Sequence, residues 1–564
     1  MNSFLLALLA IVGYILAYHT YGKYLAKRIF KLRDKNRMPS HELEDGVDYV
    51  PTKRQIVFGH HFTTIAGLGP IVGPAIGIIW GWLPAFLWVF FGSIFMGAVH
   101  DFSSLIISAR NKGKSIGELT GDIISPSTRL AFQFIMQFLL FIVISVFSMI
   151  VGLLFEMYPE AVFPVWMQIP IAVWLGRQIR KGKNDLLYSL IAVALMYITV
   201  IMGTWIPIKM PILFGMPPVS IWVLILLVYV YFASTIPVQK LLQPRDYINS
   251  HQLLIAMGLM FIGLAVVHPP ITAPVINPAA TAPGSDIPAL APLLFITIAC
   301  GAISGFHSLA SSGTTVKQVD KEGDTLFIGY GGMLWESLLA VLVLMAIAGG
   351  LGITDPDAFN HHYSSWASAS GLNAKLAAFV QGAANLFRGI GIPDNIGKSI
   401  IAVFIVSFAN TTLDSATRIQ RLSLQEIFTR RNGNVIKPMD NRYVATFIVV
   451  LAAGLLAFSR PAADGAMSLW PLFGSLNQLL AALALAVVTV YLFQRKKKFM
   501  LTFIPMIFVL VMTVWAMIEN LFTFVNDNDL VLAVLSGIIL ILTIWLMISG
   551  VFFLVKYKKV SLNT

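Results

Sequence analysis

Apolar stretches of about twenty residues recur along the whole chain, separated by shorter polar segments. A predominantly apolar run of about twenty residues is long enough to cross a bilayer as a helix. The pattern therefore predicts an all-α polytopic membrane protein with about fifteen transmembrane helices in a single transmembrane domain. The predicted helices lie near residues 3–28, 57–79, 83–108, 130–155, 161–176, 185–205, 218–237, 250–267, 288–312, 326–350, 396–417, 443–459, 467–493, 500–521 and 528–555.

Two segments need separate treatment. The connection 353–395 contains KLAAFVQGAANLFRGI, which is amphipathic and too short to span comfortably, so an interfacial or re-entrant helix fits it better. The first apolar run has neither a basic segment before it nor a small-residue cleavage site. It is therefore interpreted as a retained membrane helix and not as a signal peptide.

Lysine and arginine are concentrated in alternate connections between the predicted helices. Cytoplasmic loops of membrane proteins carry an excess of these residues, so the alternation predicts an external N-terminus and a cytoplasmic C-terminus. The segment 353–395 fits least well, because it is predicted to be external and yet carries Lys375 and Arg388. The basic connections contain residues 23–33, 110–114, 177–183, 240–245, 317–321, 418–431 and 495–498.

Composition agrees with a membrane protein and limits the other classes. Hydrophobic residues make up 57% and charged residues 12% of the 564 positions, whereas soluble domains carry about 25% charged residues. The net charge of +12 comes from short loops, and without a separate basic domain it does not indicate a nucleic-acid partner. The single cysteine, Cys300, excludes an intramolecular disulfide.

Two segments share a pattern of glycine, histidine and small polar residues: GHHFTTIAGLGPIVGP at 59–74 and GFHSLASSGTT at 305–315. Under the predicted topology they run in opposite directions across the membrane, as inverted-topology repeats require. The chain is therefore predicted to contain an inverted repeat. The matching positions are Gly59, His61 and Gly67 in the first segment and Gly305, His307 and Gly313 in the second.

Glycine and proline are expected to interrupt the helices in these segments. Gly67, Gly69, Pro70, Gly73 and Pro74 weaken or remove i→i−4 hydrogen bonds, so the first helix should unwind near the middle of the membrane. Unwound backbone is tolerated in a bilayer only where it lines a cavity or packs in protein. Freed carbonyls can hold a cation, and helix N-termini can face an anionic group. Close packing of small residues is the alternative use of such glycines.

Five longer stretches resemble the carbon starvation protein A (CstA) family of bacterial transporters: GHHFTTIAGLGPIVGPAIG, GWLPAFLWVFFGSIFMGAVHDF, SGFHSLASSGTTVKQ, SFANTTLDSATRIQR and LWPLFGSLNQLLAALAL. The resemblance covers most of the chain. It implies a LeuT-type (APC superfamily) inverted-repeat core with discontinuous helices, in a bacterial cell membrane. It also implies uptake of peptides or pyruvate during carbon starvation, without choosing between them.

The LeuT-type arrangement suggests how the chain is divided. Residues 57–205 would form the first repeat, 218–267 inserted helices, 288–493 the second, inverted repeat, and 500–564 C-terminal helices. Both Gly/His segments then fall on the discontinuous helices of their repeats. The role of the inserted helices is not defined by the sequence.

Polar residues inside the apolar segments are the candidates for function. The two adjacent histidines His60 and His61 point about 100° apart on a helix and cannot both face one ligand. A histidine exchanges protons near neutral pH, although a buried neutral histidine satisfied by a carbonyl is the alternative. The histidines lack metal-ligand spacing, so no metal site is predicted. The candidates for substrate binding or proton coupling are His60, His61, Thr63, Thr64, Gly67, Gly69, Gly305, His307, Ser311, Ser312, Gly313, Thr314 and Glu336.

Two intramembrane carboxylates need partners, because a charge in the membrane is costly when it is unpaired. Asp101 is expected to pair with His100 or a basic loop residue as a structural or gating contact, and a proton relay is the alternative. Glu336 lies near the middle of its helix without an obvious local partner. It is therefore either functional or hydrogen-bonded to a neighbouring helix.

The stretch FANTTLDSATR is the other dense polar cluster. The hydroxyls of Thr411, Thr412 and Ser415 are candidates for a cation site, closed by unwound carbonyls near Gly67. The LeuT-type resemblance implies sodium sites of this composition. Asp414 and Arg418 stand four residues apart, so a structural or gating ion pair on one helix face is predicted.

The combined features favour a secondary active transporter, a symporter coupled to H+ or, less favoured, Na+, that alternates access between the two faces. The chain lacks a P-loop, a zinc-protease motif, GxSxG and CxxC, which argues against an ATP-driven pump and an enzyme. No channel-filter motif is evident. A membrane sensor of starvation is the remaining alternative. The expected partners are a small-molecule substrate and the lipid bilayer, with no cofactor; the sequence does not define the oligomeric state.

Overall fold

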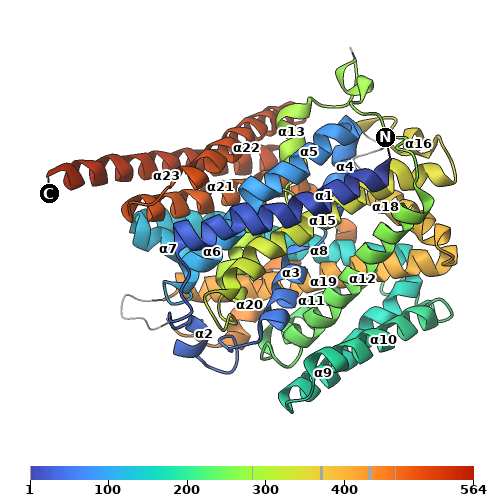
Figure 1. The fold of residues 1–564 in the computed structure, drawn as a ribbon, viewed down its shortest axis with the longest axis horizontal. Helices are drawn as coiled ribbons and strands as arrows, with labels where there is room; N and C mark the ends of the chain where they lie inside the picture. The colour runs from blue at the N-terminus through green and yellow to red at the C-terminus, as the bar shows by residue number, and fades with distance from the viewer. Residues whose placement is uncertain are drawn as a thin grey trace.

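The structure, a computed structural model, describes residues 2–563 except 283, 367, 369–371, 430–434, 464 and 466. Its helices run mostly along the longest axis of the molecule, and the two termini lie at opposite ends of that axis (Figure 1). In the described chain, eleven helical segments are long and apolar enough to span a membrane, and a bent helix pair adds a twelfth candidate. The chain is thus a multi-pass membrane protein.

The eleven continuous candidates coincide with predicted spans. They are built on α1 (Ser3–Ala17), α5 (Trp82–Gly92) with α6 (Ala98–Ala109), α8 (Pro126–Met157), α10 (Asp185–Gly203), α11 (Pro218–Thr235), α12 (Leu242–Val267), α15 (Gly332–Met345), α19 (Asp394–Ile427), α21 (Trp470–Gln494), α22 (Met500–Asn526) and α23 (Leu530–Asn563). The bent pair is α3 (Arg54–Ile65) with α4 (Gly69–Gly77).

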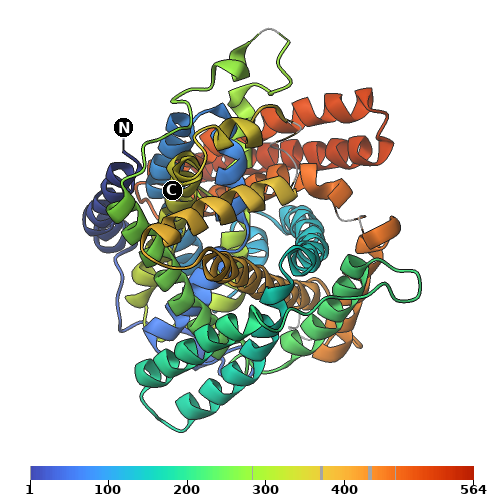
Figure 2. The same cartoon turned by 90° about the vertical axis from the view of Figure 1, so that its right-hand side faces the viewer.

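The three other predicted spans also fall on helices. α20 (Arg442–Ala457) is a shorter apolar helix, and α13 (Leu290–Thr297) is separated from α14 (Gly305–Ala310) by non-helical residues. α9 (Val162–Arg180) pairs with α10 at the edge of the molecule (Figure 2). The count of fifteen spans therefore remains a prediction.

The amphipathic segment between 353 and 395 forms the predicted helix, α18 (Leu372–Gly389). It packs against α4, α12 and α19, and its side chains Phe379, Leu386 and Phe387 are fully buried. Helix α18 therefore covers the second half of the bent pair. Short helices α2 (Pro39–Glu42), α7 (Ile116–Ile123) and α16 (Ala358–His362) occupy the ends of the molecule (Figure 1).

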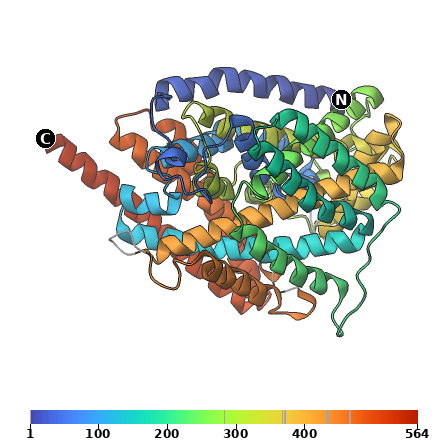
Figure 3. The ribbon, with the colours of Figure 1, turned by 90° about the horizontal axis from the view of Figure 1, so that it is seen from below.

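Two pairs of connections that are predicted to share a side of the membrane contact each other in the structure. One end of the molecule carries the connections rich in lysine and arginine and is here called the basic end. There, the Val50 amide donates to the Lys317 carbonyl (2.9 Å). At the other end, the Trp82 amide donates to the Pro274 carbonyl (3.0 Å). Helix α1 runs along one edge, and α23 projects from the basic end (Figure 3). Which end faces the cytoplasm remains a prediction.

Two helix boundaries differ from the sequence prediction. Helix α12 begins at Leu242 instead of near 250, so Arg245 lies in a helix and is buried, not in a basic loop. Helix α19 continues to Ile427, past the predicted end near 417. Polar residues extend both helices because they find partners in neighbouring helices. Arg430 and Arg431 of the predicted basic loop lie outside the described residues.

Candidate functional site

Two interrupted helices meet in the interior. Helices α3 and α4 are bent by 43° at the break 66–68, and α13 and α14 are separated by residues 298–304. A Cβ atom on Gly69 would lie 2.2 Å from Cys300 Sγ, and one on Gly73 would lie 2.7 Å from the Thr297 carbonyl oxygen. Only glycine permits this approach. The predicted discontinuity of both helices is confirmed.

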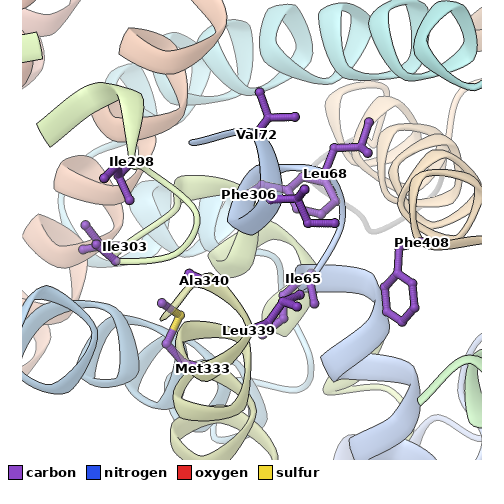
Figure 4. Packing of buried hydrophobic residues seen from close by; sticks show 14 of the residues in the cluster. Ile65, Leu68, Val72, Ile298, Ile303, Phe306, Met333, Leu339, Ala340 and Phe408 are labelled. Atoms are coloured by element: carbon purple, nitrogen blue, oxygen red, sulfur yellow. The ribbon is translucent and has the colours of Figure 1, made fainter. Parts of the chain in front are cut away.

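Apolar side chains pack around the two breaks. Leu68 and Val72 from the first segment lie near Phe306 from the second, as Figure 4 shows. Ile298 and Ile303 lie within the second break, and all five side chains are at most 5% exposed. The interrupted backbone is therefore enclosed by protein, which is where a bilayer tolerates it.

A cavity of about 520 Å³ reaches both breaks. Its walls come from α4, from the segment 286–300 and from the facing ends of α18, α21 and α22. Gly69 is the only one of the predicted substrate-binding residues found among its described lining residues. The lining residues include Gly69, Val72, Gly73, Asp286, Thr297, Cys300, Trp366, Lys375, Trp470, Asn520, Thr523 and Asp527.

His307 lies between two carboxylates directly after the second break. Its Nδ1 is 2.9 Å from Asp101 Oδ2, and its Nε2 is 3.3 Å from Glu336 Oε2. The other oxygen of Asp101 lies 2.9 Å from His100 Nδ1. All four side chains are fully buried. The predicted Asp101–His100 contact is thus present, and Glu336 has a partner on another helix.

This cluster of His100, Asp101, His307 and Glu336, here called the His307 network, is incompletely hydrogen-bonded. Within the described part of the chain, His307 Nε2, His100 Nε2 and both Glu336 oxygens have no hydrogen-bond partner. Most buried polar groups are hydrogen-bonded, and exceptions need an explanation. Intramembrane groups of this kind mark proton relays and ligand sites.

The side chains of the adjacent residues His60 and His61 point toward different partners, as predicted. His60 Nδ1 lies 2.6 Å from Asp246 Oδ2, and its Nε2 lies 3.3 Å from the Thr314 hydroxyl. His61 Nδ1 instead lies 3.0 Å from the Thr315 hydroxyl. Both histidines therefore connect the first interrupted helix to the segment after α14, although only His60 contacts a carboxylate.

The predicted Asp414–Arg418 ion pair is wrong. Asp414 Oδ2 lies 2.5 Å from Arg245 Nη1 and accepts a hydrogen bond from the Tyr229 hydroxyl (3.0 Å). Arg418 contacts Asp48 instead, with 2.7 Å between Nη1 and Oδ1. Spacing along one helix shows only local partners, whereas packing brings α12 and the loop 31–53 against α19.

The loop residue Asp48 joins two arginines of α19 at the basic end. Arg421 Nη2 lies 2.9 Å from its second oxygen. Burial alone would raise the pKa of Asp48, but the guanidinium groups of Arg421 and Arg418 outweigh burial and lower that pKa well below its usual range. The contact therefore ties the loop 31–53 to α19.

Two of the three predicted cation-site hydroxyls meet the first interrupted helix. Thr412 donates to the Thr64 carbonyl (3.1 Å), and Ser415 lies 3.0 Å from the Thr64 hydroxyl. Thr411 faces away, accepting hydrogen bonds from Asn249 (2.8 Å) and Arg245 (3.3 Å). A guanidinium beside Thr411 disfavours a second cation there.

Among the remaining predicted polar residues, Ser312 reaches another element, because its hydroxyl accepts a hydrogen bond from the Ile116 amide (3.0 Å). Thr63 donates to the Gly59 carbonyl (2.7 Å), and Ser312 donates to the Ser308 carbonyl (2.6 Å). Ser311 has no hydrogen-bond partner among the described residues. Backbone and side chains also pack closely against the last two predicted glycines, Gly305 and Gly313. These positions support the interrupted helices without reaching the cavity.

The family model of carbon starvation protein CstA matches residues 2–516. This chain belongs to the CstA family. The peptide transporter CstA of Mycobacterium tuberculosis (strain H37Rv) is 33% identical, with 90% of this chain and 74% of that protein covered. The peptide transporter CstA of Bacillus subtilis is 31% identical, with 96% and 94% covered. The pyruvate/proton symporter BtsT of Escherichia coli K12 is 32% identical, with 90% and 80% covered.

Solved structures similar to this CstA-family chain are more distant. MhsT in complex with L-phenylalanine is 13% identical, with a TM-score of 0.46 and coverage of 90% of this chain and 98% of that one. A Na+-coupled sialic acid symporter is 14% identical, with a TM-score of 0.39 and coverage of 95% and 96%. These likenesses do not place residues, and the division into inverted repeats remains a prediction. The named relatives are transporters, in agreement with the expectation that the chain is not an enzyme.

Sequence reasoning missed several residues of this site in the CstA-family chain. Asp246 and Tyr229 complete the contacts of His60 and Asp414, and Asp48 pairs with Arg418. Their partners lie far away in sequence, so no local spacing marks them. Lys375 lines the cavity, and its one available signal is that it breaks the alternation of basic loops.

Proposed function

We propose that this chain is a secondary active transporter that imports small carboxylate-bearing nutrients, peptides or pyruvate, by proton-coupled symport with alternating access. Its family membership supports the transport class, and the names of its relatives support both substrates. The proposed location is a bacterial cell membrane, with the N-terminus outside and the basic end in the cytoplasm.

The position of His307 carries the proposal. This histidine follows the second break directly and lies between Asp101 and Glu336 in a fully buried site. A proton bound here changes the charge balance of a low-dielectric site, where electrostatic interactions are strong. The bond to Asp101 holds the ring, so the exchangeable proton is assigned to the Nε2 side that faces Glu336.

The second break can link this proton to substrate. Cys300 in this break lines the cavity, and His307 lies in the first turn of α14 directly after the break. Substrate that binds against the interrupted backbone would therefore shift the start of α14. The same movement changes the distances from His307 to the two carboxylates, which couples substrate binding to protonation. By linkage, protonation then favours substrate binding to the same extent.

Sodium is the second candidate ion. Thr412 and Ser415 place oxygen atoms beside Thr64 at the first break, which favours a cation there. The site has fewer predicted hydroxyls than the sequence suggested, because Thr411 faces Arg245. Proton coupling is therefore the preferred proposal.

Uptake into proteoliposomes tests the proposed function. Purified protein is reconstituted, and either a pH gradient or a sodium gradient is imposed without the other. Radiolabelled pyruvate, dialanine and trialanine are compared in each case. An inwardly directed proton gradient should drive accumulation of at least one substrate above its external concentration. Accumulation driven only by sodium would contradict proton coupling, and no transport of any substrate would contradict the proposed function.

A further inference from the structure

Lys375 is a buried amine in the wall of the cavity that reaches the two breaks. It lies on α18 and is only 4% exposed. In the described parts of the chain, its ammonium group makes no hydrogen bond or ion pair, although Asp286 and Asp527 line the same cavity. Both carboxylate residues are exposed, whereas Lys375 is buried.

A buried lysine whose ammonium group has no ionic partner is unfavourable. Transfer of a charge out of water costs much more than transfer of a neutral polar group unless the charge is paired. Accordingly, burial lowers the pKa of Lys375 to about 7. A leucine or methionine would fill the wall without this cost, so the position of Lys375 indicates a binding role.

We propose that Lys375 binds the carboxylate of the transported substrate inside the cavity, next to the two interrupted helices. This inference rests on the proposed function. An anion would supply the partner that the ammonium lacks, and a charge-assisted hydrogen bond is about twice as strong as a neutral one. The cavity also contains Gly69 and Cys300, so a bound carboxylate lies in the same space as both breaks.

The cavity suits small carboxylates that differ in their other end. Its volume of about 520 Å³ falls in the usual range of ligand pockets, about 300–1,000 Å³. Pyruvate and a peptide share the carboxylate that Lys375 would bind. A peptide also has an ammonium group, for which Asp286 and Asp527 provide opposite charge at the wall of the cavity. Comparing the two substrates therefore separates the common contact from the peptide-specific one.

Calorimetric titration of the full chain in nanodiscs tests the proposal independently of transport. Pyruvate and dialanine are the probes, and pyruvamide is the uncharged control. Lys375→Met should weaken binding of both carboxylates by at least about tenfold, the loss expected for a charged hydrogen bond. Lys375→Arg should restore most of the affinity. Lys398→Met is the matched control, because Lys398 lies on the neighbouring α19 and pairs with Asp394 (2.7 Å).

The outcomes separate this inference from the proposed function. Normal affinity of folded Lys375→Met for both carboxylates would overturn the role of Lys375, even if the wild-type protein transports them. If the wild-type protein binds the carboxylate probes and Lys375→Met does not, the carboxylate site at Lys375 is supported. This conclusion holds even if the wild-type protein accumulates neither substrate, so that the transport proposal fails. Absence of binding of either probe to the wild-type protein would overturn the carboxylate site. Equal binding of pyruvamide would also overturn it.

Discussion

Replacement of His307 by glutamine tests whether the His307 network carries the coupling proton. Glutamine can keep a hydrogen bond to Asp101, but its amide does not titrate near neutral pH. We expect His307→Gln to lose substrate accumulation driven by a pH gradient while it still exchanges labelled for unlabelled substrate. The two activities separate because exchange needs alternating access with substrate bound, and not net proton movement.

The expected size of the effect follows from the coupling. One pH unit corresponds to about 1.4 kcal/mol per proton, so one coupled proton supports about tenfold accumulation at equilibrium. The uncoupled variant should equilibrate substrate at a ratio of about one, the complete loss of this factor. His307→Gln should lose less folding free energy than His307→Ala, because Asp101 keeps its contact with His100 (2.9 Å). His307→Ala removes both contacts and should approach the about 3–5 kcal/mol loss of a broken buried pair.

The assay uses proteoliposomes with a one-unit pH gradient and, separately, counterflow without a gradient. His61→Gln is the matched control, since His61 is also fully buried but contacts the Thr315 hydroxyl and, among the described residues, no carboxylate. It should keep the gradient response. Folded yield is measured for each variant by size-exclusion chromatography.

Two results would refute the role of His307. Accumulation of substrate at the wild-type ratio by folded His307→Gln would show that the coupling proton binds elsewhere. If His307→Gln folds with normal yield but loses both counterflow and accumulation, His307 is needed for substrate binding or access and not for coupling alone.

Three further predictions concern other parts of the chain. Thr412→Val should abolish any sodium stimulation of uptake and leave proton-driven uptake intact. If uptake by the wild-type protein does not depend on sodium, the prediction of a sodium site is wrong. Single cysteines at Lys112 and Val275, in a Cys300→Ser background, should react with impermeant reagents from opposite sides, and labelling from one side would contradict the topology. Asp48→Asn leaves two buried arginines unpaired and should cost about 3–5 kcal/mol, seen as a lower thermal midpoint; an unchanged midpoint would refute a structural role for this contact.

The interrupted helices could be predicted from sequence because their cause is local. Glycines and prolines near Gly67, and glycines at Gly301 and Gly305, weaken hydrogen bonds within a few residues, and the structure breaks at 66–68 and 298–304. The grouping of loops at two ends was also predictable, since lysine and arginine mark alternate connections. The ends of the helices were harder to predict, because α12 and α19 extend through buried polar residues that a hydropathy pattern assigns to loops.

The partners of buried charges could not be predicted from local spacing. Asp414 and Arg418 have ideal spacing for an ion pair, yet each contacts a residue from another element, Arg245 and Asp48. The matched repeat positions predicted similar roles for His61 and His307. Packing gives only His307 two carboxylates, because its neighbours come from α6 and α15. The different contacts of His61 and His307 therefore come from tertiary packing and could not be predicted from the repeat pattern.

The two faces of the second break suit an alternating-access transporter. On one side, Cys300 lines a cavity of about 520 Å³, and on the other, the fully buried His307 lies between two carboxylates. A substrate and a proton can then act on the same short backbone segment without touching each other. Movement of that segment is expected to change the close contact between Gly69 and Cys300, so both interrupted helices would respond together.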